Sequence, residues 1–339
     1  MTYNPEEFRF RTHYLGDFAT EPKLNYAKRY TDAVAKLAEL QKKQDEGKKL
    51  GSVQAKDIVE LPNLIEVYEK DKDKVNFSAT AANRIRSCVD QAKYNIIYNL
   101  DNKYVTKGLV CEDDSIALNK KLEGVPMTKN KTRIQNHLIA GEWDIDWQSK
   151  TLGKVTDDIK TAYSKDSFNK INSLKSIYYW QGTGYMWLND SDYARIVHVL
   201  VNTPPDLIIA EHNNMLYKHK PKGMTLEDFS FTEEGTQIRT QFFRNHTYTD
   251  HGWVSNYDGS SEYLESGYWD YLVETQLLDS AYQFTPIPDN QRRKVFQFKR
   301  NNDDIQWIEN KLKLAKNEFL RLYYDDSPMI YNLEKDDFE

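Results

Sequence analysis

The sequence predicts an α/β fold. Helical patterns fill the first part of the chain, strand patterns begin near residue 136, and a strongly apolar strand follows one further helix. Hydrophobic residues make up 39% of the 339 residues and aromatic residues 13%, so the chain can bury a core and is not broadly disordered.

The N-terminal helices carry start and stop signals. Pro22 suits a first helical turn, and Ser78 or Thr80 can cap a later helix. We expect Pro62 to interrupt its helix and Gly124 to end another. The predicted helices cover 22–48, 55–70, 78–100 and 112–124.

The predicted strands alternate between apolar and polar residues, as in a sheet with one buried face. Trp143 and Ile145 alternate with Asp144 and Asp146 along 136–148. The turn SKTLG then leads into a second strand, which predicts a hairpin. The remaining predicted elements are a strand at 154–163, a helix at 170–188, strands at 194–202 and 294–300, and a helix at 303–324.

The element order predicts one catalytic core with additions at both ends. We expect a helical N-terminal elaboration at 1–75, the core at 76–210, and a C-terminal extension at 211–339 that packs on the core. The extension would end in the strand 294–300 and the helix 303–324. The sequence contains no internal repeat and no low-complexity linker.

Composition excludes several classes of protein. The formal net charge of −6 differs from the basic balance of a protein that coats DNA, although a local basic groove could still serve a nuclease. Two cysteines are too few for a multi-disulfide framework or a four-cysteine metal site, and no GxxxxGK[ST] motif is present for ATP hydrolysis. The N-terminus lacks a signal-peptide pattern, and no segment has the ~20 apolar residues of a membrane span. We therefore expect a soluble, cytoplasmic protein.

The stretch VTDDIKTAY (155–163) places charged residues in a strand pattern. Alternation puts Asp158 and Lys160 on one face and Ile159 on the other. If the two strands pair, Asp144 and Asp158 can project from the same face near the same end. Two converging carboxylates raise each other's pKa, and a divalent cation such as Mg²⁺ relieves the conflict. Asp-x-Lys is common, so solvated strand faces are the alternative interpretation.

Three motifs together resemble the PD-(D/E)xK nuclease superfamily: GEWD (141–144), DIK (158–160) and QGTGY (181–185). They are most similar to its YqaJ-like and lambda-exonuclease-like phage recombination branch, and also to the nuclease domain of RecB. The motifs support the resemblance over about 105–210, with a looser likeness over most of the chain. The resemblance implies a restriction-endonuclease-like core, with a central mixed sheet flanked by helices.

The resemblance also implies a role for each matched residue. Asp144 and Asp158, with the carbonyl of Ile159, would bind one or two Mg²⁺ or Mn²⁺ ions, and Glu112 would complete or support the ligand shell. Lys160 would position the attacking water. Gln181 and Tyr185 lie four residues apart, on one face of the predicted helix, and would orient the site and contact the nucleic-acid backbone. Nearby basic residues add candidate phosphate contacts: Lys131, Arg133 and Lys165.

The sequence departs from the family pattern in two places, and the first is Trp143, which precedes Asp144 where many members have a proline. Glu112 is followed by Asp113 and Asp114, so the helical acid could be shifted by one or two residues. Asp157 competes with Asp158, but only Asp158 lies two residues before the lysine.

The sequence therefore predicts a Mg²⁺-dependent DNA nuclease, and the resemblance favours an exonuclease that degrades linear duplex DNA. The implied setting is phage recombination or replication in the host cytoplasm, beside a single-strand annealing protein. Two alternatives stay open: an endonuclease or resolvase of the same fold, and a non-catalytic DNA-binding or virion-associated protein. The resemblance leaves open whether the chain forms a homo-oligomer, and the sequence gives neither polarity nor strand preference.

Overall fold

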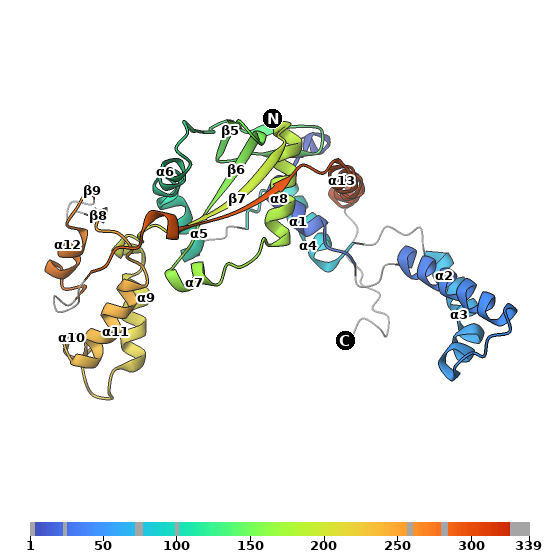
Figure 1. The fold of residues 1–339 in the computed structure, drawn as a ribbon, viewed down its shortest axis with the longest axis horizontal. Helices are drawn as coiled ribbons and strands as arrows, with labels where there is room; N and C mark the ends of the chain where they lie inside the picture. The colour runs from blue at the N-terminus through green and yellow to red at the C-terminus, as the bar shows by residue number, and fades with distance from the viewer. Residues whose placement is uncertain are drawn as a thin grey trace. The chain divides into compact units, whose positions relative to one another are not determined.

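A computed structural model describes residues 4–22, 26–71, 77–98, 102–255, 260–278 and 284–325 (Figure 1). The chain forms two compact units, each described here by itself. The first consists of Met1–Ile97, His137–Ile139 and Asp303–Glu339, and the second of Tyr98–Asn136 and Ala140–Asn302. These bounds differ from the predicted parts 1–75, 76–210 and 211–339.

The first unit joins the two ends of the chain. Helix α13 (Asn302–Tyr324) buries the predicted apolar stripe, and the ring of Phe319 stacks on Phe8 with 4.4 Å between ring centroids. This aromatic contact explains why α13 belongs with the N-terminal residues and not with a C-terminal extension. The buried residues of α13 are Ile305, Ile308, Leu312, Ala315 and Phe319.

Helix α4 (Ala79–Tyr94) begins and ends at side-chain and backbone caps. Ser78 is the N-cap, because its hydroxyl accepts a hydrogen bond from the N–H of Ala81. Asn95 closes the helix in the left-handed conformation, so the helix ends before the predicted residue 100. Residues 99 and 100 of that prediction lie outside the described segments.

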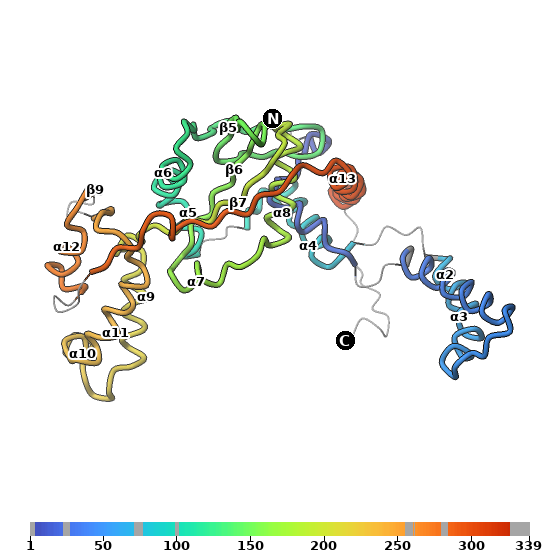
Figure 2. Tube along the Cα trace, in the orientation of Figure 1, coloured from blue at the N-terminus to red at the C-terminus, as the bar shows by residue number. Residues whose placement is uncertain are grey.

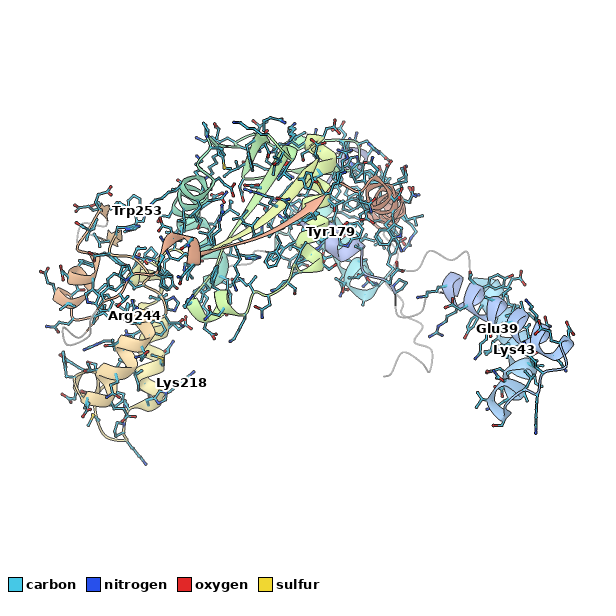
Figure 3. The ribbon with its side chains drawn as sticks, in the orientation of Figure 1. Glu39, Lys43, Tyr179, Lys218, Arg244 and Trp253 are labelled. Atoms are coloured by element: carbon cyan, nitrogen blue, oxygen red, sulfur yellow. The ribbon has the colours of Figure 1, made fainter. Side chains whose placement is uncertain are left out.

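Helices α2 (Tyr26–Asp45) and α3 (Ser52–Asp71) pack on each other as a hairpin. Pro62 lies inside α3, so the predicted interruption is wrong. Pro62 is exposed, whereas the side chains around it face α2, and this packing offsets the lost backbone hydrogen bond. Glu39 and Lys43 form an exposed ion pair on α2 (Figure 3). The hairpin's own core consists of Ala33, Leu37, Leu40, Leu50, Ile58, Leu61, Ile65 and Tyr68.

The second unit is built on a mixed sheet of five strands within the described residues. Their order is β10-β7-β6-β5-β2, and β6 and β7 pair in parallel while the other neighbours pair antiparallel. In Figure 2 the orange-red tube of β10 returns beside β7. The bounds are β2 Thr128–Lys129, β5 Ile145–Ser149, β6 Gly153–Thr161, β7 Tyr193–Val199 and β10 Arg293–Lys299.

Helices cover both faces of this sheet, as predicted. Helix α6 (Glu112–Glu123) contacts β6 and β7 from one face, and α8 (Ser176–Asn189) contacts the same strands from the other (Figure 1). Gly124 ends α6 in the left-handed conformation, as expected. The α/β class with a central mixed sheet flanked by helices is confirmed.

Other predicted bounds shift by several residues. The expected helix 170–188 begins only at Ser176, after the short separate helix α7 (Lys165–Asn169). The expected strand 136–148 divides into β4 (Ile139–Gly141), which pairs with β3 (Ile134–Gln135), and β5. The rest of the unit comprises α5 Lys103–Val110, α9 Ile209–His219, α10 Leu226–Ser230, α11 Glu233–Arg244, β8 Gly252–Ser255, β9 Ser261–Leu264 and α12 Tyr268–Glu274.

In the described part of the chain, no helix combines the length and the apolar character that crossing a membrane requires.

Candidate active site

The two adjacent carboxylates of β6 point to opposite faces of the sheet and have different surroundings. Asp157 is fully buried on the α6 face, where Arg195 donates to both of its oxygens at 2.8 and 2.6 Å. Asn119 on α6 and Trp147 on β5 donate further hydrogen bonds. Four donors satisfy Asp157 completely, so it is a structural carboxylate. Asp158 is left as the carboxylate of the α8 face.

Asp144 meets Asp158 across the β5–β6 hairpin. Ile145 pairs with Asp157, so the register places Asp144 opposite Asp158. The Asp144 carboxylate accepts a hydrogen bond of 2.5 Å from the N–H of Ile159. Burial raises the pKa of Asp144 to about 7, and the Asp158 carboxylate adds to this rise while Lys160 opposes it. The predicted convergence of the two carboxylates is present in the structure.

Lys160 lies beside Asp158 on the same face. Its Nζ is 2.6 Å from Asp158 Oδ2, and its side chain is 26% exposed. Burial alone lowers the pKa of Lys160, but Asp158, Tyr185 and Asp144 together outweigh burial and raise the pKa overall. The ring of Tyr178 lies 5.5 Å from the ammonium. Lys160 is therefore a partly accessible ammonium whose charge the carboxylates stabilise.

Helix α8 supplies a polar pair to the same face. Gln181 donates to the hydroxyl of Tyr185 at 2.8 Å and approaches Asp158 Oδ1 at 3.5 Å. Tyr185 is 4% exposed, so its hydroxyl serves Gln181 inside the protein. Close packing of α8 sets this position, because a Cβ at Gly182 would lie 2.6 Å from Phe298. The predicted placement of Gln181 and Tyr185 on one helix face is present, with the tyrosine buried.

Glu112 begins α6 but does not join the two aspartates closely. Lys129 on β2 holds its carboxylate at 2.9 Å and also binds Asp113 at 3.1 Å. Glu112 is still near enough for its charge to contribute to the raised pKa of Asp144. Among the described residues, no three Asp, Glu, His or Cys side chains gather into a metal-binding group. Glu112 thus lies at the edge of the site, paired with a lysine.

Sequence reasoning missed His198, which lies beside the lysine. It is the partner of Lys160 in the parallel β6–β7 register and is 6% exposed. Its ring meets Tyr178 and Phe296 edge-on. Burial, and next the charge of Lys160, lowers the pKa of His198 to about 4, so the ring is neutral near pH 7. Only the strand register, which a single sequence does not reveal, could have located it.

The predicted phosphate contacts differ in exposure. Lys131 and Arg133 are exposed in the segment before β3. Lys165 is half-buried at the start of α7, with its ammonium 5.4 Å from the ring of Phe168. The structure tests none of the three as a nucleic-acid contact.

The donor set of this site suits a hard divalent cation. Asp158 Oδ2 is buried and has no well-aligned hydrogen bond, although the lysine ammonium lies close to it. Burial raises the pKa of Asp158, as it does for Asp144, so the pair lacks sufficient positive charge nearby. Mg²⁺ and Mn²⁺ prefer carboxylate and carbonyl oxygens, which are the ligands that Asp144, Asp158 and Ile159 can supply.

The second unit is an α/β structure with a mixed sheet, and solved structures share the fold of the chain. No family model matches the chain, and no curated protein matches it. A phage-related exonuclease from Haemophilus somnus 129PT has a TM-score of 0.53 and 19% identity, covering 93% of this chain and 95% of that one. This likeness establishes a shared fold.

An alkaline exonuclease, LHK-Exo from Laribacter hongkongensis, matches with a TM-score of 0.41 and 11% identity over 74% of this chain and 84% of that one. LHK-Exo in complex with dAMP matches with a TM-score of 0.40 and 11% identity, over 73% and 83%.

Proposed function

We propose that this chain is a metal-dependent nuclease that hydrolyses phosphodiester bonds of DNA. The observation that carries the proposal is the convergence of Asp144, Asp158 and Lys160 on one face of the sheet, with Gln181 behind Asp158. Each side chain suits one part of such a hydrolysis. The fold shared with a phage-related exonuclease supports the same reaction class.

The metal site would use Asp144, Asp158 and the carbonyl of Ile159. A bound Mg²⁺ or Mn²⁺ ion supplies a water of lowered pKa and neutralises charge on the phosphate. The Ile159 N–H fixes the Asp144 carboxylate, and Gln181 restrains Asp158, so both acids are held in place before an ion arrives. Glu112 could support this shell only by exchanging its bond to Lys129.

Lys160 would act as a charged donor. Its raised pKa keeps the ammonium protonated near pH 7, so it cannot serve as the general base. Its N–H groups can orient the attacking water and stabilise negative charge on the phosphoryl oxygens. In the reaction the water gives up a proton as its oxygen bonds to phosphorus, the bond from phosphorus to the leaving oxygen breaks, and the leaving oxygen takes up a proton.

The finer proposal is an exonuclease for linear duplex ends, in phage recombination or replication and beside a single-strand annealing protein. It rests on the sequence resemblance and on the shared fold. Lys131, Arg133 and Lys165 would contact phosphates, and the chain would act alone or as a homo-oligomer.

The test compares end-labelled linear duplex with covalently closed circular plasmid, in Mg²⁺ and in EDTA. We expect the linear DNA alone to be degraded, only in Mg²⁺. Asp158→Asn should lower the rate by on the order of 10³-fold while retaining DNA binding, because it removes a charged ligand from the site. Asp146→Asn, an exposed acid on the neighbouring strand, is the matched control and should cleave like the parent.

Two other results would each favour an alternative to the exonuclease proposal. Nicking of the circular plasmid would indicate an endonuclease or resolvase of this fold. DNA binding by parent and Asp158→Asn alike, without cleavage of either substrate, would indicate a non-catalytic DNA-binding protein.

A further inference from the structure

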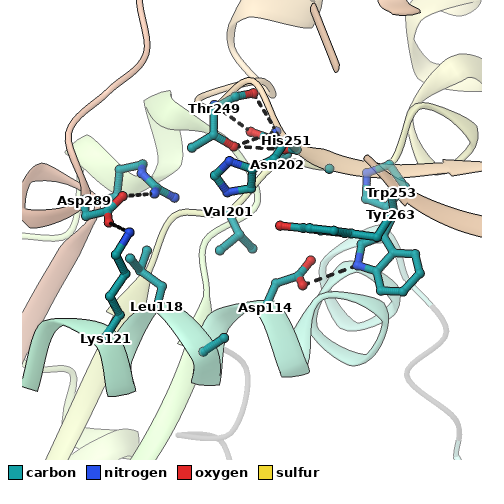
Figure 4. A pocket seen from close by; sticks show the side chains of 14 residues that line it. Asp114, Leu118, Lys121, Val201, Asn202, Thr249, His251, Trp253, Tyr263 and Asp289 are labelled. Atoms are coloured by element: carbon teal, nitrogen blue, oxygen red, sulfur yellow. Dashed lines mark hydrogen bonds and ion pairs between the residues drawn. The ribbon is translucent and has the colours of Figure 1, made fainter. Parts of the chain in front are cut away.

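A polar cavity of about 160 Å³ lies in the second unit (Figure 4). It is built from α6, the chain that follows β7, and the β8–β9 hairpin, and it shares no residue with Asp144, Asp158, Lys160 or Gln181. Trp253 and Tyr263 form an aromatic wall, with ring centroids 5.2 Å apart. Leu118 and Val201 supply an apolar floor.

The basic residues of this cavity are already neutralised. Asp289 binds Arg292 at 2.5 Å and Lys121 at 2.7 Å. Arg292 is 3% exposed and also donates to the carbonyls of Ile287 and Leu200. A phosphate would have to displace a carboxylate from both cations, so the cavity does not favour an anion.

Asn202 is likewise fully engaged. Its amide nitrogen donates to the carbonyls of Thr249 and His251, and its oxygen accepts from the N–H groups of Tyr248 and Thr249. The Asn202 amide therefore holds the backbone of residues 248–251 in place, and its hydrogen-bonding groups are already used.

Three polar groups remain available to a ligand in the described part of the chain. Asp114 receives a hydrogen bond of 3.3 Å from Trp253 on one oxygen, which leaves the other oxygen as an acceptor. The hydroxyl of Tyr263 and the ring nitrogens of His251 make no hydrogen bond to any described residue. Burial, and next the charge of Arg292, lowers the pKa of His251, so its ring is neutral near pH 7 and can donate or accept. Figure 4 shows the Tyr263 hydroxyl, His251 and Asp114 turned toward the same space.

The size and chemistry of the space fit one flat heterocycle. An apolar cavity of ~150 Å³ holds a benzene molecule, so this cavity can hold a single six-membered ring. A carboxylate acceptor selects a ring that carries an amino donor, as aspartate does with the N4 amino group of cytosine. Trp253 offers a face for stacking, which adds affinity for any base.

We propose that this cavity binds one unpaired nucleobase that carries an amino group, with cytosine the best fit. Asp114 accepts from the amino group, while His251 and Tyr263 bond to the ring nitrogen and carbonyl. The inference rests on the proposed function in one respect, because DNA is the source of the base.

The test measures binding of deoxycytidine, thymidine and 2-deoxyribose 5-phosphate by ligand-observed NMR in EDTA. We expect deoxycytidine to bind at least tenfold more tightly than thymidine, and the sugar phosphate not to bind. Asp114→Asn should reverse the preference: the new amide oxygen keeps the bond from Trp253, and its NH₂ group then faces O4 of thymidine. A reversal cannot come from misfolding, which would abolish binding of both nucleosides.

Controls separate this cavity from other binding. Asp270→Asn, an exposed acid on α12, should bind like the parent. Trp253→Leu should weaken deoxycytidine binding by roughly tenfold, since it removes an aromatic ring on which the base stacks. The inference is wrong if Asp114→Asn leaves the preference for deoxycytidine unchanged, or if the sugar phosphate binds as well as the nucleoside.

The outcome is independent of cleavage. Asp158→Asn protein should bind deoxycytidine like the parent, because Asp158 is not part of the cavity. Cleavage without nucleoside binding would refute the cavity proposal alone, and nucleoside binding without cleavage would refute the nuclease proposal alone.

Discussion

The adjacent residues Asp157 and Asp158 should respond in opposite ways to substitution. Asp157→Ala removes the bidentate carboxylate partner of the buried Arg195 guanidinium and leaves it the ion pair with Glu123, and we expect it to destabilise the protein by about 3 kcal/mol. Asp158→Asn removes a buried carboxylate whose pKa burial raises, and should leave stability in EDTA unchanged or higher. Urea unfolding of both variants in EDTA measures the difference. Equal loss of stability in the two would contradict the assignment of roles.

At the scale of single residues, local periodicity predicts which side chains of the candidate site share a face. Strand alternation separates Asp158 and Lys160 from Ile159, and helix spacing brings Gln181 and Tyr185 together, so local periods suffice. Their partners were not predictable, because they come from distant parts of the chain. Arg195 on β7 saturates Asp157, and Lys129 on β2 holds Glu112. No local pattern connects those pairs.

At the scale of elements, the packing of α8 against the sheet should depend on Gly182. A methyl group at this position would lie 2.6 Å from Phe298 and 3.1 Å from Ala194. We expect Gly182→Ala to cost about 1–3 kcal/mol through overpacking and to lower nuclease activity, because Gln181 moves with the helix. Thermal unfolding and the linear-duplex assay measure both effects.

Gly108→Ala on α5 is the matched control. A methyl group added at Gly108 would have no neighbouring atom within 4 Å, so the change should be neutral or should stabilise by up to ~1 kcal/mol. If the two alanine variants behave alike, steric contact with Phe298 is not what positions α8.

The ends of several helices differ from those that local sequence signals predict, because tertiary packing decides where each helix begins and ends. Pro62 predicts a break, yet α3 continues because Ile58, Leu61 and Ile65 pack against α2. The apolar residues after residue 170 predict one helix, but Lys175 is extended as its N-cap and the helix begins only at Ser176. Propensity identified these helices, and tertiary contacts set their limits.

At the scale of the whole molecule, the α2–α3 hairpin should be dispensable. Its core uses only residues from the two helices and their connection. We expect deletion of residues 26–71, bridged by a Gly/Ser linker, to leave the remaining chain folded and able to cleave linear DNA. Circular dichroism melting and the duplex assay test this expectation. Loss of the cooperative transition would show that the hairpin stabilises the rest.

Deletion of 302–325 is the contrasting control. Helix α13 buries five apolar residues and stacks Phe319 on Phe8, so its loss should unfold the first unit. The sequence predicts α13 and its apolar stripe, but the partner of that stripe lies at the opposite end of the chain. Long-range pairing of this kind has no local signature.

The ion pair between Asp157 and Arg195 also favours one register of β6 against β7. The register of β6 matters because a slip of one residue would exchange the faces of Asp157 and Asp158 and place Asp157 on the α8 face. In the aligned register Arg195 lies opposite Asp157, and a slip in one direction would place the guanidinium opposite Thr156, without this carboxylate. The contact that stabilises the fold therefore also helps to determine that Asp158, the proposed metal ligand, lies on the α8 face.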